Sequence, residues 1–235
     1  MRNRIKIACL ACLLLTGCEQ FTPQKMALVI YSDRTDQSIV QPTLADIQSV
    51  VDTKSNPNLG VDVIYQHIGD TDYIRQYNIQ LPAVTVLENT HQRNSDTKRF
   101  YKRLDSLLLY ENAQQYHYKN SSVLFPLLEL LQELQNGTTN NNVILLYSDL
   151  TEFSDLYNSY ANRKMLLENP LQVAKELKEK VQIPKVINTQ LYLIYEPKTK
   201  EQNRMFRSWV LIYKELFTEK GIKVKVGLEK QWHHE

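Results

Sequence analysis

The chain has 235 residues, of which 43% are hydrophobic and 23% charged, a balance typical of a globular protein with one large domain. Its 28 basic and 26 acidic residues give a formal charge of only +2 without a concentrated positive stretch, which excludes the usual basic type of nucleic-acid-binding protein. Nucleotide binding is excluded as well, because the chain has only six glycines and neither a G-x-x-x-x-G-K-[Ser/Thr] nor a G-x-G-x-x-G motif.

The N-terminal segment has the layout of a secretory signal. Three basic residues within the first six precede an apolar run over residues 7–15, which is too short to span a bilayer. The run ends in Leu-Thr-Gly-Cys over residues 15–18, which resembles the lipobox of bacterial lipoproteins. This resemblance implies that residues 1–17 are a signal peptide and that Cys18 is lipidated after cleavage. The alternative is an ordinary signal, or a short anchor, with a chance cysteine.

The predicted cleavage changes both the charge and the cysteine content. It removes three basic and no acidic residues, so that 25 basic residues face 26 acidic ones and the formal charge becomes −1. Of the three cysteines, Cys9, Cys12 and Cys18, the mature chain keeps only the lipidated one, which excludes disulfides, thiol catalysis and cysteine-bound metals. Because no later segment reaches membrane-spanning length, the lipid is the expected anchor.

Runs of strand length alternate with helical patterns along the rest of the chain. Apolar, β-branched or aromatic runs predict strands over residues 26–31, 61–68, 83–87, 143–147, 190–195 and 222–228. Helical spacing of apolar residues predicts helices over residues 42–51, 96–118, 123–135, 171–181 and 199–220. Pro42, Pro126 and Pro170 are expected in first turns, and Gly137 and Gly221 at helix ends.

This alternation predicts an α/β domain over residues 25–230, with a lipidated tether over 18–24 and a tail over 231–235. We expect a three-layer, doubly wound, Rossmann-like fold with a mostly parallel six-stranded sheet in the order 3-2-1-4-5-6. No crossover helix is evident over residues 69–81, so the third strand is predicted to be an antiparallel edge strand.

The same polar motif, Y-S-D-x-T-[Asp/Glu]-x-S, follows two of the predicted strands. It occupies residues 31–38 and 147–154, here named the first and second hooks. In an open α/β sheet, ligands bind beyond the carboxyl ends of the strands, where the strand order reverses. The predicted order places the first and fourth strands side by side at that point, so Asp33 and Asp149 are expected to project into one crevice.

Two carboxylates in one crevice require a compensating charge or a shared proton. At an assumed separation of about 5 Å and an effective dielectric of about 20, their repulsion is roughly 3 kcal/mol. Carboxylates mixed with serine and threonine hydroxyls are hard oxygen ligands, which suit Mg²⁺, Ca²⁺ or Mn²⁺. A divalent-cation site is therefore one interpretation of the hooks.

From residue 25 to about residue 230 the chain resembles the von Willebrand factor type A domain, mainly in the order of its elements. That family binds protein ligands through a metal ion-dependent adhesion site with D-x-S-x-S after the first strand, a threonine before the helix that precedes the fourth strand, and an aspartate after the fourth strand. Asp33, Thr35 and Asp149 match this pattern, and the resemblance implies that they hold Mg²⁺ or Ca²⁺. Ser38, Ser121 and Ser122 are further candidate ligands.

The chain departs from the family pattern at three places. Gln37 occupies the last serine place, with Ser38 one residue later; the loop before residue 123 offers serines in place of threonine; and Leu150 stands where glycine often follows the aspartate. Helix capping is the alternative interpretation of the hydroxyls: Thr35 and Ser38 would cap the helix after the first hook, and Thr151 or Ser154 a segment over residues 155–167.

Three hypotheses about function follow. The first is a lipid-anchored protein-binding module in the bacterial cell envelope, facing the periplasm or the outside, with a divalent cation in the crevice. The second is a metal-dependent hydrolase that uses Asp33 and Asp149 to activate water. The third is a structural lipoprotein with an inert crevice. Because no histidine or other general base is evident near either hook, we expect a binding protein and not an enzyme.

Overall fold

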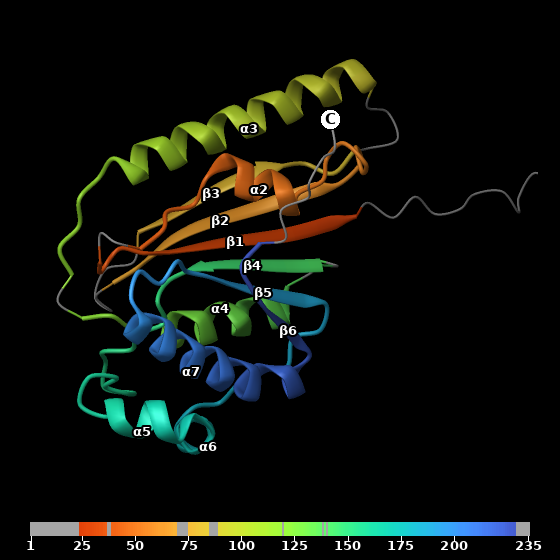
Figure 1. Ribbon diagram of the computed structural model, residues 1–235. Coiled ribbons are helices and arrows are strands. Elements are labelled where there is room, and N and C mark those ends of the chain that lie inside the picture. Colours follow the sequence, from red (N-terminus) through yellow and green to blue (C-terminus); the bar gives the residue numbers. More distant parts are fainter. Residues whose placement is uncertain are drawn as a thin grey trace, which may run out of the picture.

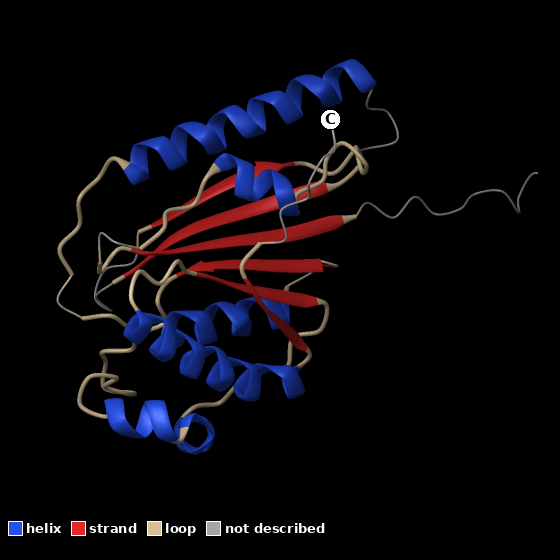
Figure 2. Cartoon of the chain, viewed as in Figure 1, coloured by secondary structure: helices blue, strands red, loops and turns tan. Residues whose placement is uncertain are grey.

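The protein has an α/β Rossmann-like architecture built around one six-stranded sheet (Figures 1 and 2). The computed structural model describes residues 24–36, 39–69, 75–84, 89–118, 120–137, 139 and 141–228. The six strands are β1 (Lys25–Asp33), β2 (Gly60–Ile68), β3 (Gln76–Leu81), β4 (Asn141–Tyr147), β5 (Thr189–Ile194) and β6 (Ile222–Val226). The helices are α2 (Leu44–Val50), α3 (Thr90–Asn112), α4 (Leu124–Asn136), α5 (Arg163–Glu168), α6 (Pro170–Lys180) and α7 (Lys200–Phe217), and a 3₁₀ turn over Thr218–Lys220 follows α7.

The sheet has the predicted topology. Its strand order is β3-β2-β1-β4-β5-β6, and all neighbouring strands run parallel except β2 and β3, which are antiparallel. The predicted order and the antiparallel edge strand are therefore confirmed.

Helices cover both faces of the sheet, which explains the long apolar runs in its central strands. Figure 1 shows α2 and α3 on one face and α4 and α7 on the other. Successive residues of β1 point to opposite faces, so Leu28 and Ile30 pack on the side of α2 and α3, whereas Val29 and Tyr31 pack on the side of α4 and α7. From Met26 onward every residue of β1 is buried. A strand buried on both faces reads as a continuous apolar run, as the sequence indicated.

The third strand lies earlier in the chain than predicted. The prediction placed it over residues 83–87, but β3 is Gln76–Leu81, and residues 85–88 lie outside the described part. In β3, buried Ile79 and Leu81 alternate with exposed amide side chains, which is the pattern of an edge strand with one covered face. Strand β3 is therefore not a strongly apolar run, because only every second residue faces the core.

Helix boundaries also differ from the prediction. Helix α3 begins at Thr90 and not at 96, because the side chain of Asn89 caps it by accepting from the Gln92 amide at 2.8 Å. Helix α2 begins after Thr43, which forms a capping box with Asp46, so Pro42 lies before the cap and not in the first turn.

Two helices, α5 and α6, lie between β4 and β5. The sequence predicted one helix there, over residues 171–181, and before it a capped segment over residues 155–167. Pro126 does lie in the first turn of α4, and Pro170 is the first residue of α6. Gly221 ends the 3₁₀ turn after α7 with a left-handed φ of 85°. No helix within the described ranges combines the length and the apolar character needed to cross a membrane.

Candidate functional site

The two hooks begin side by side at the carboxyl edge of the sheet. Strands β1 and β4 are parallel neighbours, and Ser32 of β1 is in register with Tyr147, the last residue of β4. The chain leaves β1 toward one outer edge of the sheet and leaves β4 toward the other, so this is the point where the strand order reverses. In folds of this kind the ligand crevice lies here.

A direct hydrogen bond joins the second hook to the first. The Ser148 hydroxyl donates to Oδ2 of Asp33 at 2.6 Å, across 115 residues of chain. The same hydroxyl oxygen accepts from the backbone amide of Leu150 at 2.9 Å. The Asp33 carboxyl therefore belongs to both hooks.

Each hook folds into the same local turn. Oδ1 of Asp33 accepts from the Thr35 amide at 3.0 Å, and Oδ1 of Asp149 accepts from the Thr151 amide at 2.8 Å. An aspartate that accepts from the amide two residues later forms an Asx turn, which explains the shared D-x-T spacing. The Thr35 hydroxyl adds a bond of 2.6 Å to Oδ1 of Asp33.

The second hook contains a residue in an unusual conformation. Leu150 has a φ of 64° and a fully buried side chain. A non-glycine residue in this left-handed region costs on the order of 1 kcal/mol. Leu150 occupies the place where the resembled family often has glycine, and its side chain packs in the core on the α4 and α7 side.

Burial dominates the electrostatics of the two aspartates. It raises the pKa of Asp33 to about 6, although the bonds from Ser148 and Thr35 oppose the rise, and the charge of Asp149 adds to it. Burial likewise raises the pKa of Asp149 against the bonds from Thr151, and the nearby charge of Asp36 contributes. No salt bridge joins Asp33 or Asp149 to a basic side chain within the described ranges.

Two tyrosines share the negative field of the hooks. Partial burial of its hydroxyl raises the pKa of Tyr160, and the charges of Asp149, Asp36 and Asp33 raise it further. Burial and the charges of Asp149 and Asp36 raise the pKa of Tyr195 to about 12. Tyr160 is 66% exposed, so this site offers an aromatic surface beside its carboxylates.

The candidate ligands before α4 differ in their surroundings. Ser121 pairs through its backbone with Phe153 of the second hook, and its buried hydroxyl has no hydrogen-bond partner among the described residues. The Ser122 hydroxyl bonds to the carboxylate of Glu152. Of these two hydroxyls, only that of Ser121 is therefore without a bond to another described residue. Ser38, the adjacent Gln37 and Cys18 lie outside the described residues.

The capping interpretation is wrong for Thr35 and Thr151. Thr43 caps the helix after the first hook, and the N-cap position of α5 is Asn162. Ser154 accepts from the Leu156 amide at 3.2 Å without starting a helix, because α5 begins only at Arg163. Instead, the Thr35 hydroxyl donates to Asp33 and the Thr151 hydroxyl bonds to Asp149.

The oxygen atoms of the hooks suit a hard cation. A carboxylate oxygen has two lone pairs, and Oδ2 of Asp33 accepts one bond, from Ser148. The Thr35 hydroxyl uses its hydrogen on Asp33 and keeps its lone pairs for a ligand. The described residues contain no cluster of three or more His, Cys, Asp or Glu side chains arranged to hold a metal. Carboxylate and hydroxyl oxygens of this kind are the ligands that Mg²⁺ and Ca²⁺ prefer.

A buried polar network beside the first hook was not foreseen from the sequence. Arg34 donates to the Gln41 side chain and to the Glu111 carbonyl at the end of α3, and its guanidinium lies 5.3 Å from the ring centre of Tyr116. The fully buried Glu111 carboxylate accepts from the hydroxyls of Tyr77 at 2.5 Å and Tyr116 at 2.8 Å. Only the tertiary structure brings these distant residues together.

His67 of β2 is in register with Ser32 of the first hook. Its Nε2 lies 2.7 Å from Oε2 of Glu111. Burial lowers the pKa of His67 to about 4, so the ring is neutral at neutral pH. With only 3% of its surface exposed, His67 is packed inside the fold and not presented to the crevice.

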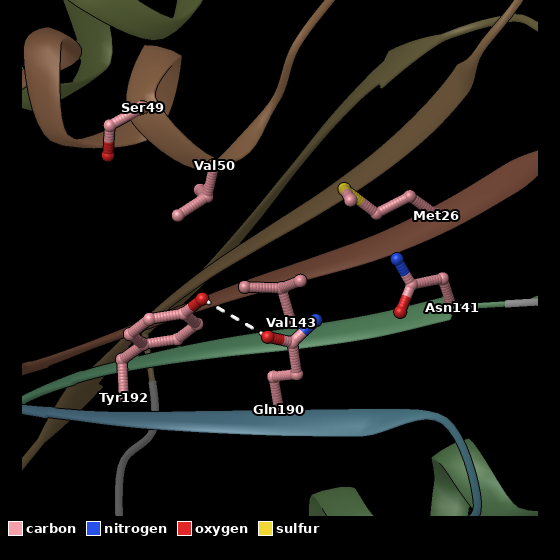
Figure 3. Close-up of a pocket in the computed structure, with 7 residues that line it drawn as sticks. All are labelled: Met26, Ser49, Val50, Asn141, Val143, Gln190 and Tyr192. Atoms are coloured by element: carbon pink, nitrogen blue, oxygen red, sulfur yellow. Dashed lines mark hydrogen bonds between the residues drawn. The ribbon is translucent and has the colours of Figure 1, made fainter. Parts of the chain in front are cut away.

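Two pockets lie at opposite ends of the central strands, one at their carboxyl ends and one at their amino ends. One of about 220 Å³ lies beside the first hook, between Arg34, Asp36 and Gln41 on one side and residues 112–116 on the other. A second of about 210 Å³ lies near the amino ends of the strands and is lined by Met26 and Tyr192 among others; there the Tyr192 hydroxyl donates to Gln190 at 3.2 Å (Figure 3). The first pocket extends the surface of the hooks.

In comparisons with known proteins, the chain matches no protein-family model and no curated protein.

Proposed function

We propose that the protein is a lipid-anchored binding module of the bacterial cell envelope, which recognises a protein partner at the crevice between its two hooks. A divalent cation, Mg²⁺ or Ca²⁺, is held there by Asp33, Thr35 and Asp149, with Ser121 as a further candidate ligand. The hydrogen bond of 2.6 Å between Ser148 and Asp33 carries this proposal, because it joins the two hooks at one carboxylate.

The resemblance to the von Willebrand factor type A domain supports the same function. The strand order with one antiparallel edge strand agrees with the order of elements on which the resemblance rests. Asp33 is the last residue of β1 and Asp149 follows β4, the two strands that the family uses for its adhesion site. A bound cation would offer an open coordination position to a carboxylate of the partner.

The direction of β1 supports display of the crevice away from the membrane. The proposed lipid on Cys18 lies seven positions before Lys25, which begins β1 at the amino edge of the sheet. The first hook leaves the other end of this nine-residue strand, about 30 Å away. A module anchored in this way would present its hooks to partners in the periplasm or outside the cell.

Calorimetric titration with MgCl₂, CaCl₂ and MnCl₂ tests the cation site. All described strands and helices lie between Lys25 and Val226, so the chain from residue 19 onward contains the fold without the lipid. We expect binding heat and a rise in melting temperature with at least one cation, because a ligand that binds only the folded state stabilises it. Asp33→Ala and Asp149→Ala should each weaken cation binding at least tenfold.

Asp52→Ala is the matched control, because Asp52 is an exposed aspartate in the loop between α2 and β2. It should leave the titration unchanged. Absence of heat and of thermal shift with all three cations, or equal binding by the two hook variants, would contradict the cation site.

A further inference from the structure

A second surface of the protein, at β3, is suited to pair with another chain. Strand β3 forms one edge of the sheet, and no described residue pairs with its outer side. The amide of His67 donates to the Arg75 carbonyl at 3.3 Å, and in an antiparallel pair hydrogen-bonded positions alternate. With the register of β2 and β3, this alternation directs the backbone groups of Gln76, Asn78 and Gln80 outward.

Between Arg75 and Pro82, the edge lacks the features that normally prevent unwanted pairing. Edge strands are usually protected by charges, proline or bulges. The opposite edge strand, β6, carries Lys223 and Lys225 in its sequence IKVKV. Strand β3, in contrast, reads QYNIQL, without charge or proline. The side chains on its uncovered face are the exposed amides of Gln76, Asn78 and Gln80. The two edges therefore differ in the way expected if β3 alone receives a partner.

A groove runs between this edge and helix α3. It has a volume of about 400 Å³, and its floor includes Tyr77, Ile79 and Leu107. Its rim on α3 carries three basic residues, Arg99, Lys102 and Arg103. A strand added beside β3 would direct every second side chain toward this helix.

The basic rim is largely free to meet a partner's charges. Lys102 and Arg103 are exposed and form no salt bridge with another described residue. Arg99 pairs with Asp96 at 3.4 Å on the surface, which is a weak interaction in water. Three positive charges next to an open strand edge favour an acidic segment.

We propose that β3 binds an extended acidic segment of a partner protein, which adds to the sheet as a further strand and places acidic side chains against Arg99, Lys102 and Arg103. Backbone hydrogen bonds to residues 76–80 would provide the pairing, and the groove would provide the preference for acidic and apolar side chains. This surface is separate from the hooks and does not depend on a cation.

Fluorescence anisotropy with labelled octapeptides tests the proposal on the chain from residue 19 onward. An alternating glutamate–valine peptide should bind at least tenfold more tightly than an alternating lysine–valine peptide. Replacing two of its valines with proline should remove binding, because proline cannot donate to a ladder. Hydrogen exchange of the amides of Gln76, Asn78 and Gln80 should slow in the complex.

Two charge reversals on α3 form a matched pair. Lys102→Glu should weaken binding of the glutamate–valine peptide at least fivefold. Lys98→Glu, at an exposed position on the same helix outside the groove, should change it less than twofold. EDTA should have no effect on this binding, which separates it from the proposed cation site.

Three outcomes would overturn the proposal: equal affinity for the two alternating peptides, equal effects of the two α3 variants, or unchanged exchange at β3 in the complex. Formation of a dimer in solution that protects the same amides without peptide would also overturn it, in favour of a second copy of the chain at this edge.

Discussion

Asp33 is the residue at which the two hooks meet. Its carboxyl group is completely buried, yet it receives three hydrogen bonds, from the amide and hydroxyl of Thr35 and from the Ser148 hydroxyl. Burial outweighs these bonds and raises its pKa to about 6. Without a cation, the Asp33 carboxyl is therefore harder to ionise in the folded protein than in the unfolded chain.

This pKa predicts the direction of a pH effect on stability. The folded protein holds the Asp33 proton up to about pH 6, whereas the unfolded chain loses it near the ordinary value of 3.8. The contribution of Asp33 to stability is therefore full below pH 3.8 and decreases as pH rises toward 6. Above that pH the loss is on the order of 3 kcal/mol for a shift of this size.

Asp33→Asn should stabilise the cation-free protein at pH 8. The asparagine oxygen can accept from Thr35 and its amide can donate to the Ser148 oxygen, so the geometry is kept while the buried charge is removed. We expect the free energy of unfolding in urea with EDTA to rise by about 1–3 kcal/mol at pH 8 and to change little at pH 4.

Asp36→Asn, at an exposed position of the same hook, should change stability by less than about 1 kcal/mol at either pH. An equal loss of stability for Asp33→Asn at both pH values would show that the ionised carboxylate is the favoured form.

At the scale of elements, the second hook fixes the start of α4. Oε2 of Glu152 accepts from the backbone amides of Val123 and Leu124 at 3.0 and 2.9 Å. These amides belong to the first turn, whose donors have no partner inside the helix. Helix α4 thus receives its cap from a residue 28 positions later in the chain, since its own N-cap residue, Val123, has no side-chain cap bond.

Glu152→Ala should destabilise the protein by about 2–4 kcal/mol, because it leaves two buried amides without an acceptor. Glu152→Gln should cost less than about 1 kcal/mol, because its amide oxygen keeps both bonds. Urea unfolding measures both. Glu129→Ala, on the exposed face of α4, serves as the control, and a loss for Glu152→Ala no larger than for this control would contradict the capping role.

At the scale of the whole molecule, the parallel strands would separate the two proposed functions in space. The hooks lie at the carboxyl ends of β1 and β4, whereas the proposed tether would join the amino end of β1, so anchoring and recognition would not compete for the same surface. The exposed edge at β3 lies beyond β2, on the other side from β4 and β5. A lipid-anchored protein with this layout could hold one partner at the crevice and another at the edge strand.

Cys18→Ala tests the anchor. In a bacterial host that processes lipoproteins, the wild-type chain should incorporate labelled palmitate and fractionate with membranes, whereas the variant should do neither. Cys12→Ala, within the predicted signal, is the control and should behave as wild type. Equal labelling of wild type and Cys18→Ala would contradict lipidation at this residue.

The amino-acid sequence by itself determined the fold class, because strand and helix identity follow from local hydrophobic periodicity and from turn residues. For this reason the apolar runs of β1 and β4 were recognised as strands. The order of strands and helices along the chain then led to the correct strand order. Strand β3 was missed, because its pattern depends on which face the core covers. The start of α3 was missed, because it depends on one side-chain hydrogen bond, from the Gln92 amide to Asn89.

Only the tertiary structure decided which contacts the repeated motif makes. The sequence indicated that Asp33 and Asp149 would share a crevice, but the bond from Ser148 to Asp33, the cap from Glu152 to α4 and the network around Glu111 join residues far apart in the chain. Such contacts have no local pattern, because they arise when packing of the sheet and helices brings distant side chains within hydrogen-bonding distance. The physical reason is that periodicity records which face of an element is buried, whereas a site is formed by the neighbours that burial brings to it.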